Sequence, residues 1–381
     1  MRILFWCDAF WPLIGGVEVL AAKLVVALKQ RGYDILVLAD RQANLSARSD
    51  YMGIPVHRLP FLETMVSGNV HEWGTVRGQV AAIKRSFRPD LVHVYHVNLD
   101  VMFHLMTNSA CPAPTLCTVH GAFIEGTTSS ETAVGRVIRS AVWLTACSAA
   151  ALGDLRRLAP EITSRSSVIW NGLEMPQLDP LPLQFDEPRL LCVGRIGTVS
   201  EKGFDLALEA MRSLVQRHPK VRLRIAGDGA GRADLERLAA TLGIADSVDF
   251  MGFVHPDRVP ALMNESTIIL MPSRVPEGFG LVALQAAQMG RPVVATRVGG
   301  VAEVVAHGET GLLVDPGNAI SLAHAIELLL DDPAQAVRMG RAARARAELL
   351  FGWERHVDAY DVLLQRLARD AAVGRAEMVS A

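Results

Sequence analysis

The segment from Pro272 to Val282 combines residue types that suit the binding of a sugar phosphate. It reads P-S-R-V-P-E-G-F-G-L-V and places the carboxylate of Glu277 between a proline turn and an expected helix start. Gly278 and Gly280 allow a ligand to approach the backbone, and the first amides of the helix can bind anionic or hydroxyl-rich groups. Glu277 would then accept hydrogen bonds from sugar hydroxyls while the amides bind phosphate oxygens. An ordinary capped surface helix is the alternative interpretation.

Two cations precede another expected helix. Arg195 follows an apolar run that ends in V-G, and Lys202 stands before Gly203 at the start of a helical pattern. A departing diphosphate needs positive charge, which arginine supplies as a two-pronged donor and lysine as a point charge. Ordinary solvent-exposed charges are the alternative.

In the first half of the chain, a glycine pair and a histidine stand where ligand-binding loops are expected. Gly15 and Gly16 lie between the first expected strand and the first helix, where backbone can approach a phosphate. His120 follows an apolar strand in T-V-H-G, so its imidazole can reach a ligand. A plain helix start and a core histidine are the respective alternatives. His93, within D-L-V-H-V-Y-H, is predicted to be a buried histidine that binds no ligand.

The composition argues against several classes of protein. A chain of 381 residues is long enough for two domains, and 38 basic against 40 acidic residues argue against a dedicated nucleic-acid binder. The sequence begins as a strand without a secretion signal and has no apolar run long enough to span a bilayer, so we predict a cytoplasmic protein. The five cysteines form no C-x-x-C pair, which favours buried thiols over disulfides or a zinc site.

Several catalytic motifs do not occur in the sequence. Because there is no D-x-D triplet, we expect no metal at a diphosphate site, and Arg195, Lys202 and a helix dipole would take that role. The sequence G-D-G-A-G-R at 227–232 departs from the dinucleotide fingerprint, since Arg232 replaces its third glycine. Hydrolase, metalloprotease and nucleotide triphosphatase functions are not indicated, because G-x-S-x-G, H-E-x-x-H and Walker A sequences are missing.

Apolar strands that alternate with amphipathic helices predict an α/β protein with two doubly wound parallel sheets. The first series is expected to have strands at 2–7, 34–39, 91–95, 115–119 and 143–147, and helices near 17–30, 72–87 and 149–158. The second series is expected to have strands at 189–194, 222–226, 247–250, 267–271 and 292–295. Two such domains facing each other would place the carboxyl ends of both sheets around one cleft.

The domain boundaries follow from a proline-rich break in this pattern. Residues 174–188 contain four prolines and almost no periodicity, so we predict a linker there, between a first domain over 1–173 and a second over 189–352. A last helix over 353–381 comes after the second series is complete. We expect this helix to pack back onto the first domain.

The chain resembles a retaining glycosyltransferase of family 4, also called glycosyl transferases group 1. The motifs that carry this resemblance are P-L-I-G-G-V-E at 12–18, T-V-H-G at 118–121, W-N-G at 170–172, V-G-R and E-K-G within 193–203, E-G-F-G-L at 277–281 and G-G-V-A-E at 299–303. The resemblance implies the GT-B fold, in which two Rossmann-like domains face each other across a cleft. It also implies that the first domain binds an acceptor and the second a nucleotide diphosphate sugar, with UDP or GDP as nucleotide.

Roles for individual residues also come from the resemblance. It implies that Gly16 approaches a phosphate, that His120 lies beside the transferred sugar, and that Arg195 and Lys202 hold the diphosphate. Glu277 would bind sugar hydroxyls. The remaining residues implied to bind the donor are Gly15, Asn171, Gly278, Phe279, Gly280, Leu281 and Gln285, together with Gly252 and Phe253 beside the base.

Gln285 departs from the family pattern. The E-x7-E spacing would place a second glutamate at this position, where its carboxylate would bind two ribose hydroxyls. A glutamine replaces a charge-assisted hydrogen bond by a neutral one, at a cost of about 1 kcal/mol. We therefore expect a change in donor affinity, because the ribose is remote from the reacting carbon.

The implied reaction is a metal-independent transfer of a hexose, with retention of configuration, to a hydroxyl of a sugar, a lipid-linked sugar or a small molecule. Since no carboxylate is well placed as a covalent nucleophile, departure of the diphosphate from the face that the acceptor attacks is the simpler mechanism. A nucleotide-sugar epimerase and a catalytically silent sugar-nucleotide binding protein are the alternatives. An epimerase would act on the donor alone, and a silent protein would lack the cationic and acidic residues found here.

The acceptor pocket is expected in the first domain. Its candidate aromatic and apolar residues are Phe10, Trp11, Val66, Trp73, Phe123 and Ile124. A lipid-linked acceptor would require peripheral contact with the inner face of the membrane, for which a candidate basic patch is formed by Arg136, Arg139, Arg156 and Arg157. Ordinary packing and ordinary solvated helix faces are the alternatives.

Overall fold

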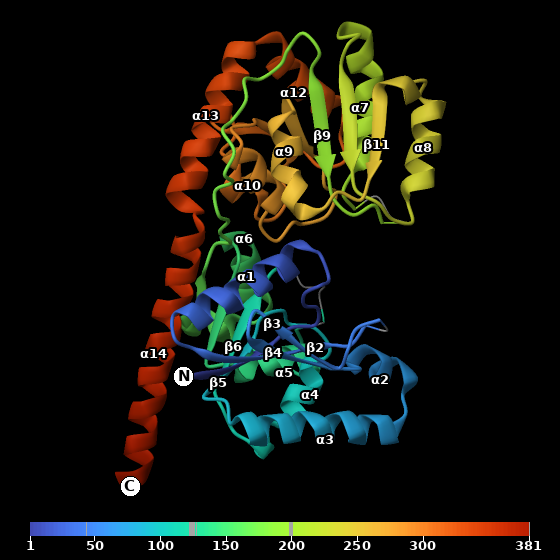
Figure 1. The fold of residues 1–381 in the computed structure, drawn as a ribbon. Helices are drawn as coiled ribbons and strands as arrows, with labels where there is room; N and C mark the ends of the chain where they lie inside the picture. Colours follow the sequence, from blue (N-terminus) through green and yellow to red (C-terminus); the bar gives the residue numbers. More distant parts are fainter. Residues whose placement is uncertain (43, 122–125, 127, 198–200, 381) are drawn as a thin grey trace. The chain divides into compact units, whose positions relative to one another are not determined.

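The computed structural model describes residues 1–42, 44–121, 126, 128–197 and 201–380, which form two compact units. Unit 1 contains residues 1–170 and the chain from residue 356 onward, and unit 2 contains Asn171–Arg355. Each unit is built on a largely parallel sheet covered by helices (Figure 1). The prediction of two doubly wound, Rossmann-like domains is confirmed.

Unit 1 contains an eight-stranded sheet in the order β3-β4-β2-β1-β5-β6-β7-β8. Its strands are β1 (Arg2–Trp6), β2 (Asp34–Asp40), β3 (Arg48–Tyr51), β4 (Ile54–Leu59), β5 (Leu91–Val94), β6 (Thr115–Val119), β7 (Trp143–Ala146) and β8 (Ser166–Val168). Only β3 and β4 pair antiparallel. The five apolar runs are strands as predicted, whereas three strands were missed. β3 is polar, β8 has three residues, and the apolar run of β4 is interrupted by a proline, a histidine and an arginine. The order of the chain reverses between β1 and β5, which makes their carboxyl ends a switch point of the sheet.

The helices of unit 1 cover this sheet. They are α1 (Gly16–Gln30), α2 (Phe61–Ser67), α3 (Val70–Phe87), α4 (Val101–Met106), α5 (Ala133–Ser140) and α6 (Ala149–Leu158), with the 3-10 helices η1 (Asn108–Ala110) and η2 (Pro160–Arg165). The central strands are buried throughout, and Phe5 and Trp6 are fully inaccessible. Such continuous burial is typical of parallel strands covered on both faces.

Unit 2 contains a six-stranded, wholly parallel sheet in the order β11-β10-β9-β12-β13-β14. Its strands are β9 (Arg189–Val193), β10 (Arg222–Ala226), β11 (Val248–Gly252), β12 (Ile268–Met271), β13 (Val293–Thr296) and β14 (Gly311–Val314). Its helices are α7 (Phe204–Arg217), α8 (Arg232–Thr241), α9 (Val259–Asn264), α10 (Leu281–Gln288), α11 (Val301–Val304), α12 (Ala319–Asp331) and α13 (Pro333–Leu350), with η3 (Ala245–Ser247) and η4 (Pro256–Arg258). The edge strand β14 was not predicted from its four residues.

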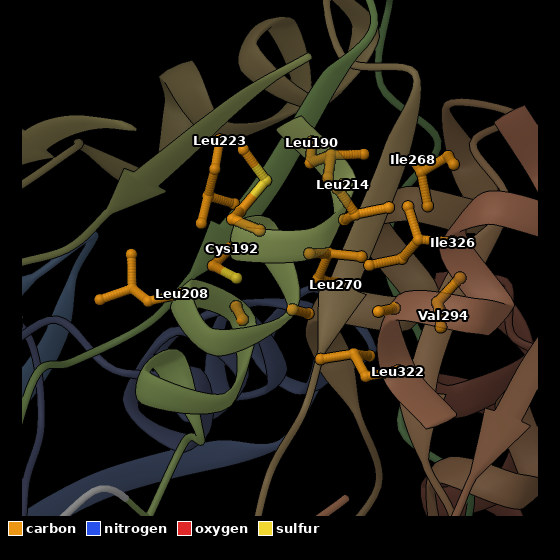
Figure 2. Close-up of a cluster of buried hydrophobic side chains, with 14 of the residues drawn as sticks. Leu190, Cys192, Leu208, Leu214, Leu223, Ile268, Leu270, Val294, Leu322 and Ile326 are labelled. Carbon is orange, nitrogen blue, oxygen red and sulfur yellow. The ribbon is translucent and has the colours of Figure 1, made fainter. Parts of the chain in front are cut away.

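Leucine, isoleucine and valine side chains fill the core of unit 2. Figure 2 shows Leu190 and Leu270 on the sheet packed against Leu214 and Ile326, which come from α7 and α12. Cys192 is fully buried in the same cluster. All five cysteines of the chain are free thiols and four of them are buried, as the sequence predicted.

The segment 174–188, predicted as a linker, is attached to unit 2. Asn264 accepts a hydrogen bond from the amide of Leu181 at 2.8 Å and donates one to the carbonyl of Asp179 at 2.8 Å. The buried guanidinium of Arg291 donates to Asn264 at 3.0 Å and also to the Leu181 carbonyl. This part of the proline-rich segment is therefore held by specific polar contacts and is not a free tether.

Helix α14 (Trp353–Ser380) contacts the N-terminal part of unit 1. The hydroxyl of Tyr33 donates to Asp361 at 2.5 Å, and the guanidinium of Arg366 stacks 3.8 Å from the centre of the Trp143 ring. Tyr360 is buried beside His93, with ring centres 5.5 Å apart. No helix in the part of the chain that the structure describes is both long and apolar enough to cross a membrane.

Buried histidines make unit 1 sensitive to acid. Burial lowers the pKa of His93 and His104 to about 3 and that of His356 to about 4. Between these values and about pH 6.5 the unfolded chain binds protons that the folded chain does not. The free energy of unfolding therefore decreases as the pH is lowered, by up to about 1.4 kcal/mol per pH unit for each group. Asp100 acts in the opposite direction, because burial raises its pKa to about 7, and so do Asp40 and His96, whose pKa values are also raised. We expect the melting temperature to decrease when the pH is lowered from 7 to 5. A melting temperature that stays constant or increases over this change would contradict the expectation.

Candidate functional site

The carboxylate of Glu277 is held by two side chains before the start of α10. Its Oε1 accepts a hydrogen bond from Lys202 Nζ at 2.7 Å and another from Ser273 Oγ at 2.5 Å. The Glu277 side chain is 15% exposed and that of Lys202 is 37% exposed. Both contacts are made to one oxygen, and no described residue is hydrogen-bonded to the other, which can therefore accept a hydrogen bond from a ligand.

Backbone contacts bring the E-K-G and P-S-R-V-P-E segments together. The amide of Arg274 donates to the carbonyl of Glu201 at 2.8 Å, and its guanidinium pairs with Asp205 at 2.5 Å. A Cβ at Gly203 would lie 1.9 Å from the carbonyl oxygen of Pro272, so only glycine allows this approach. The two motifs therefore form one rigid loop pair that presents Lys202 to Glu277.

A glycine pair in the G-G-V-A-E motif supports Glu277 from behind. The amide of Gly300 donates to the Glu277 carbonyl at 2.8 Å. Gly299 has φ 51°, and a Cβ there would lie 2.1 Å from the same carbonyl oxygen. Thr296 also donates to the carbonyl of Ser273 at 2.6 Å. The sequence indicated this motif as part of the family pattern but gave it no role.

The start of α10 offers backbone amides and few side chains. Gly280 adopts a left-handed conformation, φ 98°, and no side chain caps the helix. Phe279 is buried and packs edge-on against Phe351, with ring centres 5.4 Å apart, so only its backbone is available to a ligand. Leu281 begins the helix, and Gln285, one turn later, is half-buried and has no side-chain partner among the described residues. This arrangement suits an anion at the helix start.

Arg195 and Lys202 line a cavity of about 400 Å³ in unit 2. Arg195 is exposed and makes no ion pair or side-chain hydrogen bond with any described residue. The same cavity is also lined by Glu201, Asp205 and Asp234, whereas Glu277 and α10 do not line it. In the described parts of the chain, no group of three or more His, Cys, Asp or Glu side chains is arranged to hold a metal.

The glycines of the G-D-G-A-G-R segment have a packing role. A Cβ at Gly227, Gly229 or Gly231 would lie within about 2 Å of a carbonyl oxygen in the loop at 194–197, at 1.8, 2.1 and 2.1 Å. These glycines therefore allow the segment at 227–232 to lie against the loop at 194–197, which carries Arg195. This packing explains a glycine spacing that resembles a dinucleotide fingerprint without matching it.

Gly252 and Phe253 lie at the end of β11, an edge strand of the unit 2 sheet. Gly252 has φ 71° and accepts a hydrogen bond from the amide of Gly227 at 2.9 Å. Phe253 is 63% exposed, so its ring is available for stacking on a flat group such as a base. Strands β10 and β9 lie between β11 and β12 in the sheet, and Glu277 follows β12 in the chain. The structure thus does not bring Phe253 into contact with Glu277.

Gly15 and Gly16 lie at the start of α1, as predicted. A Cβ at Gly15 would lie 2.2 Å from Glu18 Oε2, so a carboxylate of the same helix already occupies the space beside this glycine. The negative charge complements the helix dipole. A phosphate placed beside Gly15 would have to displace the Glu18 carboxylate, a feature that the sequence motif alone did not reveal.

His120 follows β6 and has two ring nitrogens that are inaccessible to solvent and make no hydrogen bond with any described residue. Burial lowers the pKa of His120 well below its ordinary value, and the neighbouring histidines act in the same direction, so the ring is neutral. Asn171, in unit 2, is also buried and its Oδ1 lacks a partner among the described residues. His93 is fully buried and hydrogen-bonded to Thr118 at 2.8 Å, which confirms the prediction of a core histidine.

The candidate acceptor residues differ in exposure. Phe10 is buried against Tyr51 and Trp73 packs against Phe103, whereas Trp11 is 36% and Val66 is 79% exposed. Phe123 and Ile124 lie outside the residues that the structure describes. Trp11 is therefore the member of this set that combines an aromatic ring with an exposed position near the end of β1.

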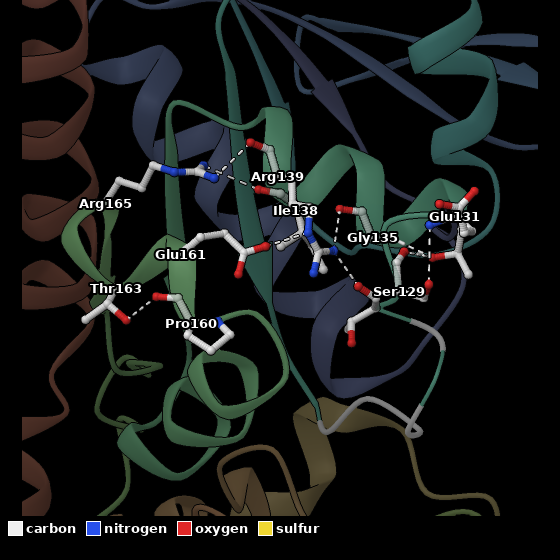
Figure 3. Close-up of polar contacts among 11 residues, drawn as sticks. Ser129, Glu131, Gly135, Ile138, Arg139, Pro160, Glu161, Thr163 and Arg165 are labelled. Atoms are coloured by element: carbon white, nitrogen blue, oxygen red, sulfur yellow. Dashed lines mark hydrogen bonds and ion pairs between the residues drawn. The ribbon is translucent and has the colours of Figure 1, made fainter.

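The arginines considered as a basic patch include two that stabilise unit 1. Figure 3 shows Arg139 paired with Glu161. The two side chains are 2.5 Å apart, and Arg139 also donates to the Thr128 carbonyl. Arg156 donates to the hydroxyl and carbonyl of Ser166. These two guanidinium groups are engaged within the fold, which leaves less free positive charge on this surface than the sequence suggested.

The chain matches two protein families. Residues 178–346 match the family described as Glycosyl transferases group 1, and residues 14–175 match Glycosyltransferase Family 4. A glycogen synthase from Mycobacterium tuberculosis (strain CDC 1551 / Oshkosh) is 30% identical over 387 residues, which cover 93% of this chain and 92% of that protein.

Solved structures share the fold. Sucrose-phosphate synthase from Thermosynechococcus elongatus superposes with a TM-score of 0.81 at 22% identity, covering 96% of this chain and 99% of that one. Anabaena Alr3699/HepE in complex with UDP-glucose superposes with a TM-score of 0.80 at 21% identity, covering 96% of this chain and 100% of that one.

Proposed function

Because the chain belongs to the group 1 glycosyltransferases of family 4, enzymes with the GT-B fold, we propose that it transfers a hexose from a nucleotide diphosphate sugar to an acceptor hydroxyl. The observation that supports this reaction best is the Glu277 carboxylate, which Lys202 and Ser273 hold before an uncapped helix start. A carboxylate suits sugar hydroxyls, and free helix amides suit phosphate oxygens. The donor is proposed to bind in unit 2.

Positive charge is proposed to stabilise the leaving diphosphate. The guanidinium of Arg195 is paired with no described residue, and Lys202 can interact with a phosphate while remaining close to Glu277. Charge develops on the diphosphate as its bond to the anomeric carbon breaks, so fixed cations stabilise the transition state more than the ground state. In unit 1, the neutral ring of His120 is proposed as the hydrogen-bonding partner of the transferred sugar.

Retention is proposed to arise by attack on the face that the diphosphate leaves. The acceptor oxygen forms a bond to the anomeric carbon as the carbon–oxygen bond to the diphosphate breaks, and the acceptor proton passes to a phosphate oxygen. The protein would supply position and electrostatic stabilisation and would need no covalent nucleophile. A glycosyl-enzyme adduct trapped during turnover would contradict this mechanism.

A donor screen tests the proposal directly. A ligand that binds only the folded protein raises its melting temperature, so UDP, GDP and ADP sugars are compared on the purified chain. UDP sugars are tested first, since one of the similar structures contains UDP-glucose. We expect protection by one class and sugar transfer that persists in excess EDTA. Loss of transfer in EDTA with recovery on adding manganese would overturn the roles of Arg195 and Lys202.

Incubation of the donor alone separates the alternatives. An epimerase would convert the nucleotide sugar without an acceptor, and a silent binding protein would show thermal protection without any turnover. A transferase requires an acceptor for full turnover. Conversion of the sugar in the free donor would therefore replace the proposed function by epimerisation.

Gln285 is expected to tune donor affinity. Substituting Gln285→Glu restores the family's charge at a half-buried position on α10, so the donor Kd should decrease by up to about tenfold while kcat stays within about twofold. Gln335→Glu, near the start of α13, adds the same charge elsewhere in unit 2 and serves as the control. A lower kcat with unchanged donor affinity would show that Gln285 does not contact the ribose.

A further inference from the structure

The carboxyl edge of the unit 1 sheet carries a hydrogen-bonded pair that the proposed function does not use. Asp8 follows β1 and His96 follows β5, the two strands at the switch point of the sheet. Asp8 Oδ1 lies 2.8 Å from His96 Nδ1, and Asn98 Nδ2 donates to Asp8 Oδ2 at 3.1 Å. Ligands of doubly wound sheets bind in the crevice outside such a switch point. The pair therefore stands where a ligand of unit 1 is expected.

The contact with Asp8 leaves the other nitrogen of His96 available. The His96 side chain is 36% exposed and that of Asp8 is 28% exposed, so a ligand can reach both. Although burial lowers it, the pKa of His96 is raised overall by the hydrogen bond and charge of Asp8. With Nδ1 fixed on Asp8, Nε2 is oriented for a ligand hydroxyl, and no described residue is hydrogen-bonded to it.

Buried polar groups without partners lie beside this pair. The ring of His120 lies 6.5 Å from that of His96 and 4.5 Å from that of Tyr95. Among the residues that the structure describes, neither the His120 nitrogens nor the Tyr95 hydroxyl has a hydrogen-bond partner, and Tyr95 is fully buried. Asp100, which is 3% exposed, likewise has one unpartnered oxygen. Unsatisfied buried groups are rare, and these lie beside the exposed Asp8–His96 pair, where an ordered water or a ligand can complete their hydrogen bonds.

The charges at this edge are unsuited to a phosphate. The described residues of the segments after β1, β5 and β6, at 7–15, 95–100, 120–121, 126 and 128–132, include no lysine or arginine. They contain Asp8 and Asp100, and Glu18 folds back onto the start of α1 beside Gly15. Phosphate recognition normally uses arginine, lysine, protonated histidine or a free helix start. The charge of a protonated His96 is offset by Asp8, whose Oδ1 lies 2.8 Å from its Nδ1. The described residues of these segments offer no lysine or arginine, and the start of α1, which no side chain caps, has the Glu18 carboxylate beside Gly15.

Arg58 does not change this conclusion. Burial and the nearby carboxylates raise the pKa of Cys7, and the charge of Arg58 lowers it. Arg58 therefore lies near this edge of the sheet. Its guanidinium, however, belongs to a residue that is 5% exposed, and it donates to the Trp11 carbonyl at 2.6 Å and to Ser49 Oγ at 2.8 Å. The cation therefore holds the loop that carries Trp11. That loop presents the 36% exposed indole ring, a flat apolar surface on which a sugar ring can pack.

We propose that unit 1 binds its acceptor at this switch point as an uncharged or amino-bearing sugar rather than as a sugar phosphate. Asp8 and Asn98 bind hydroxyl or ammonium groups, Nε2 of His96 binds a further hydroxyl, and Trp11 packs against the ring. The term acceptor rests on the proposed transferase function. The binding preference itself rests only on unit 1.

Three sugars that share one ring test this preference. Glucosamine, glucose and glucose 6-phosphate are titrated against the full chain by ligand-observed NMR, without a donor. We expect glucosamine to bind at least as tightly as glucose, and glucose 6-phosphate to bind about tenfold more weakly or worse, because its charge meets carboxylates. The isosteric change Asp8→Asn should reduce the discrimination against the phosphate to about threefold. Trp11→Ala should weaken all three sugars to a similar degree.

The matched control is Asp154→Asn. Asp154 is a 47% exposed carboxylate on α6 that pairs with Arg157, and its loss should leave the order and ratio of the three sugars unchanged. Binding of glucose 6-phosphate as tightly as glucose, or no binding of any of the three sugars, would overturn the inference. Thermal protection by UDP is measured on the same samples. Thermal protection by UDP without discrimination among the sugars would contradict this inference and support the proposed function. Discrimination among the sugars without protection by any nucleotide would support this inference and contradict the proposed function.

Discussion

Lys202→Ala is expected to lower kcat at saturating donor by about a hundredfold, and Glu277→Gln by a similar factor. Lys202 Nζ lies 2.7 Å from Glu277 Oε1, so each substitution disturbs both the cation proposed for the diphosphate and the carboxylate proposed for the sugar. Removing one such electrostatic contact typically costs about two to three orders of magnitude in rate. The double variant should be little worse than the poorer single variant, because groups that act as a unit are not additive.

Arg217→Ala provides the matched control for this pair. Arg217 lies 2.8 Å from Glu327, and Glu327 is 12% exposed, close to the 15% of Glu277. This ion pair joins α7 to α12 in unit 2 and contacts none of the candidate residues. Its loss should leave kcat within about twofold. A Lys202→Ala enzyme with full kcat would remove Lys202 from the proposed reaction, and strictly additive losses in the double variant would show that Lys202 and Glu277 do not act as one unit.

Gly299→Ala is expected to reduce kcat by at least about a hundredfold while the protein remains folded. The added Cβ would lie 2.1 Å from the Glu277 carbonyl oxygen, a distance at which the backbone of Glu277 has to move. A displacement of about 1 Å at a reacting group can cost about a hundredfold in rate. Activity is measured together with the melting temperature, so that loss of function is separated from loss of fold.

Gly308→Ala separates conformational strain from displacement. Gly308 also has positive φ, 81°, but a Cβ there would meet nothing within 4 Å. This variant should lose about 1–2 kcal/mol of stability from the left-handed backbone alone, with kcat near that of the wild type. Equal kcat in the two variants would mean that Gly299 does not position Glu277. Ser273→Ala, which removes the second contact to Glu277 Oε1 without backbone strain, should lower kcat less than Gly299→Ala does.

The sequence by itself determined the fold class and the residue types of the candidate site. Continuous apolar runs predicted the buried parallel strands, because burial on both faces of a sheet can be read from a window of five to seven residues. Glu277, Lys202 and Arg195 were found by charge and by neighbouring glycines, which are also local signals. The polar strand β3 was missed, because its residues are exposed and it is a strand only through pairing with β4.

Only the tertiary structure decided which groups meet. Lys202 and Glu277 are 75 residues apart and Asp8 and His96 are 88 apart, so no local pattern could pair them. The role of Gly299 and the position of Glu18 beside Gly15 depend on atoms that approach through space. Local periodicity reflects burial and backbone sterics within one element, whereas these contacts depend on which loops lie together at the carboxyl edge of each sheet. That order is set by packing between elements far apart in the chain.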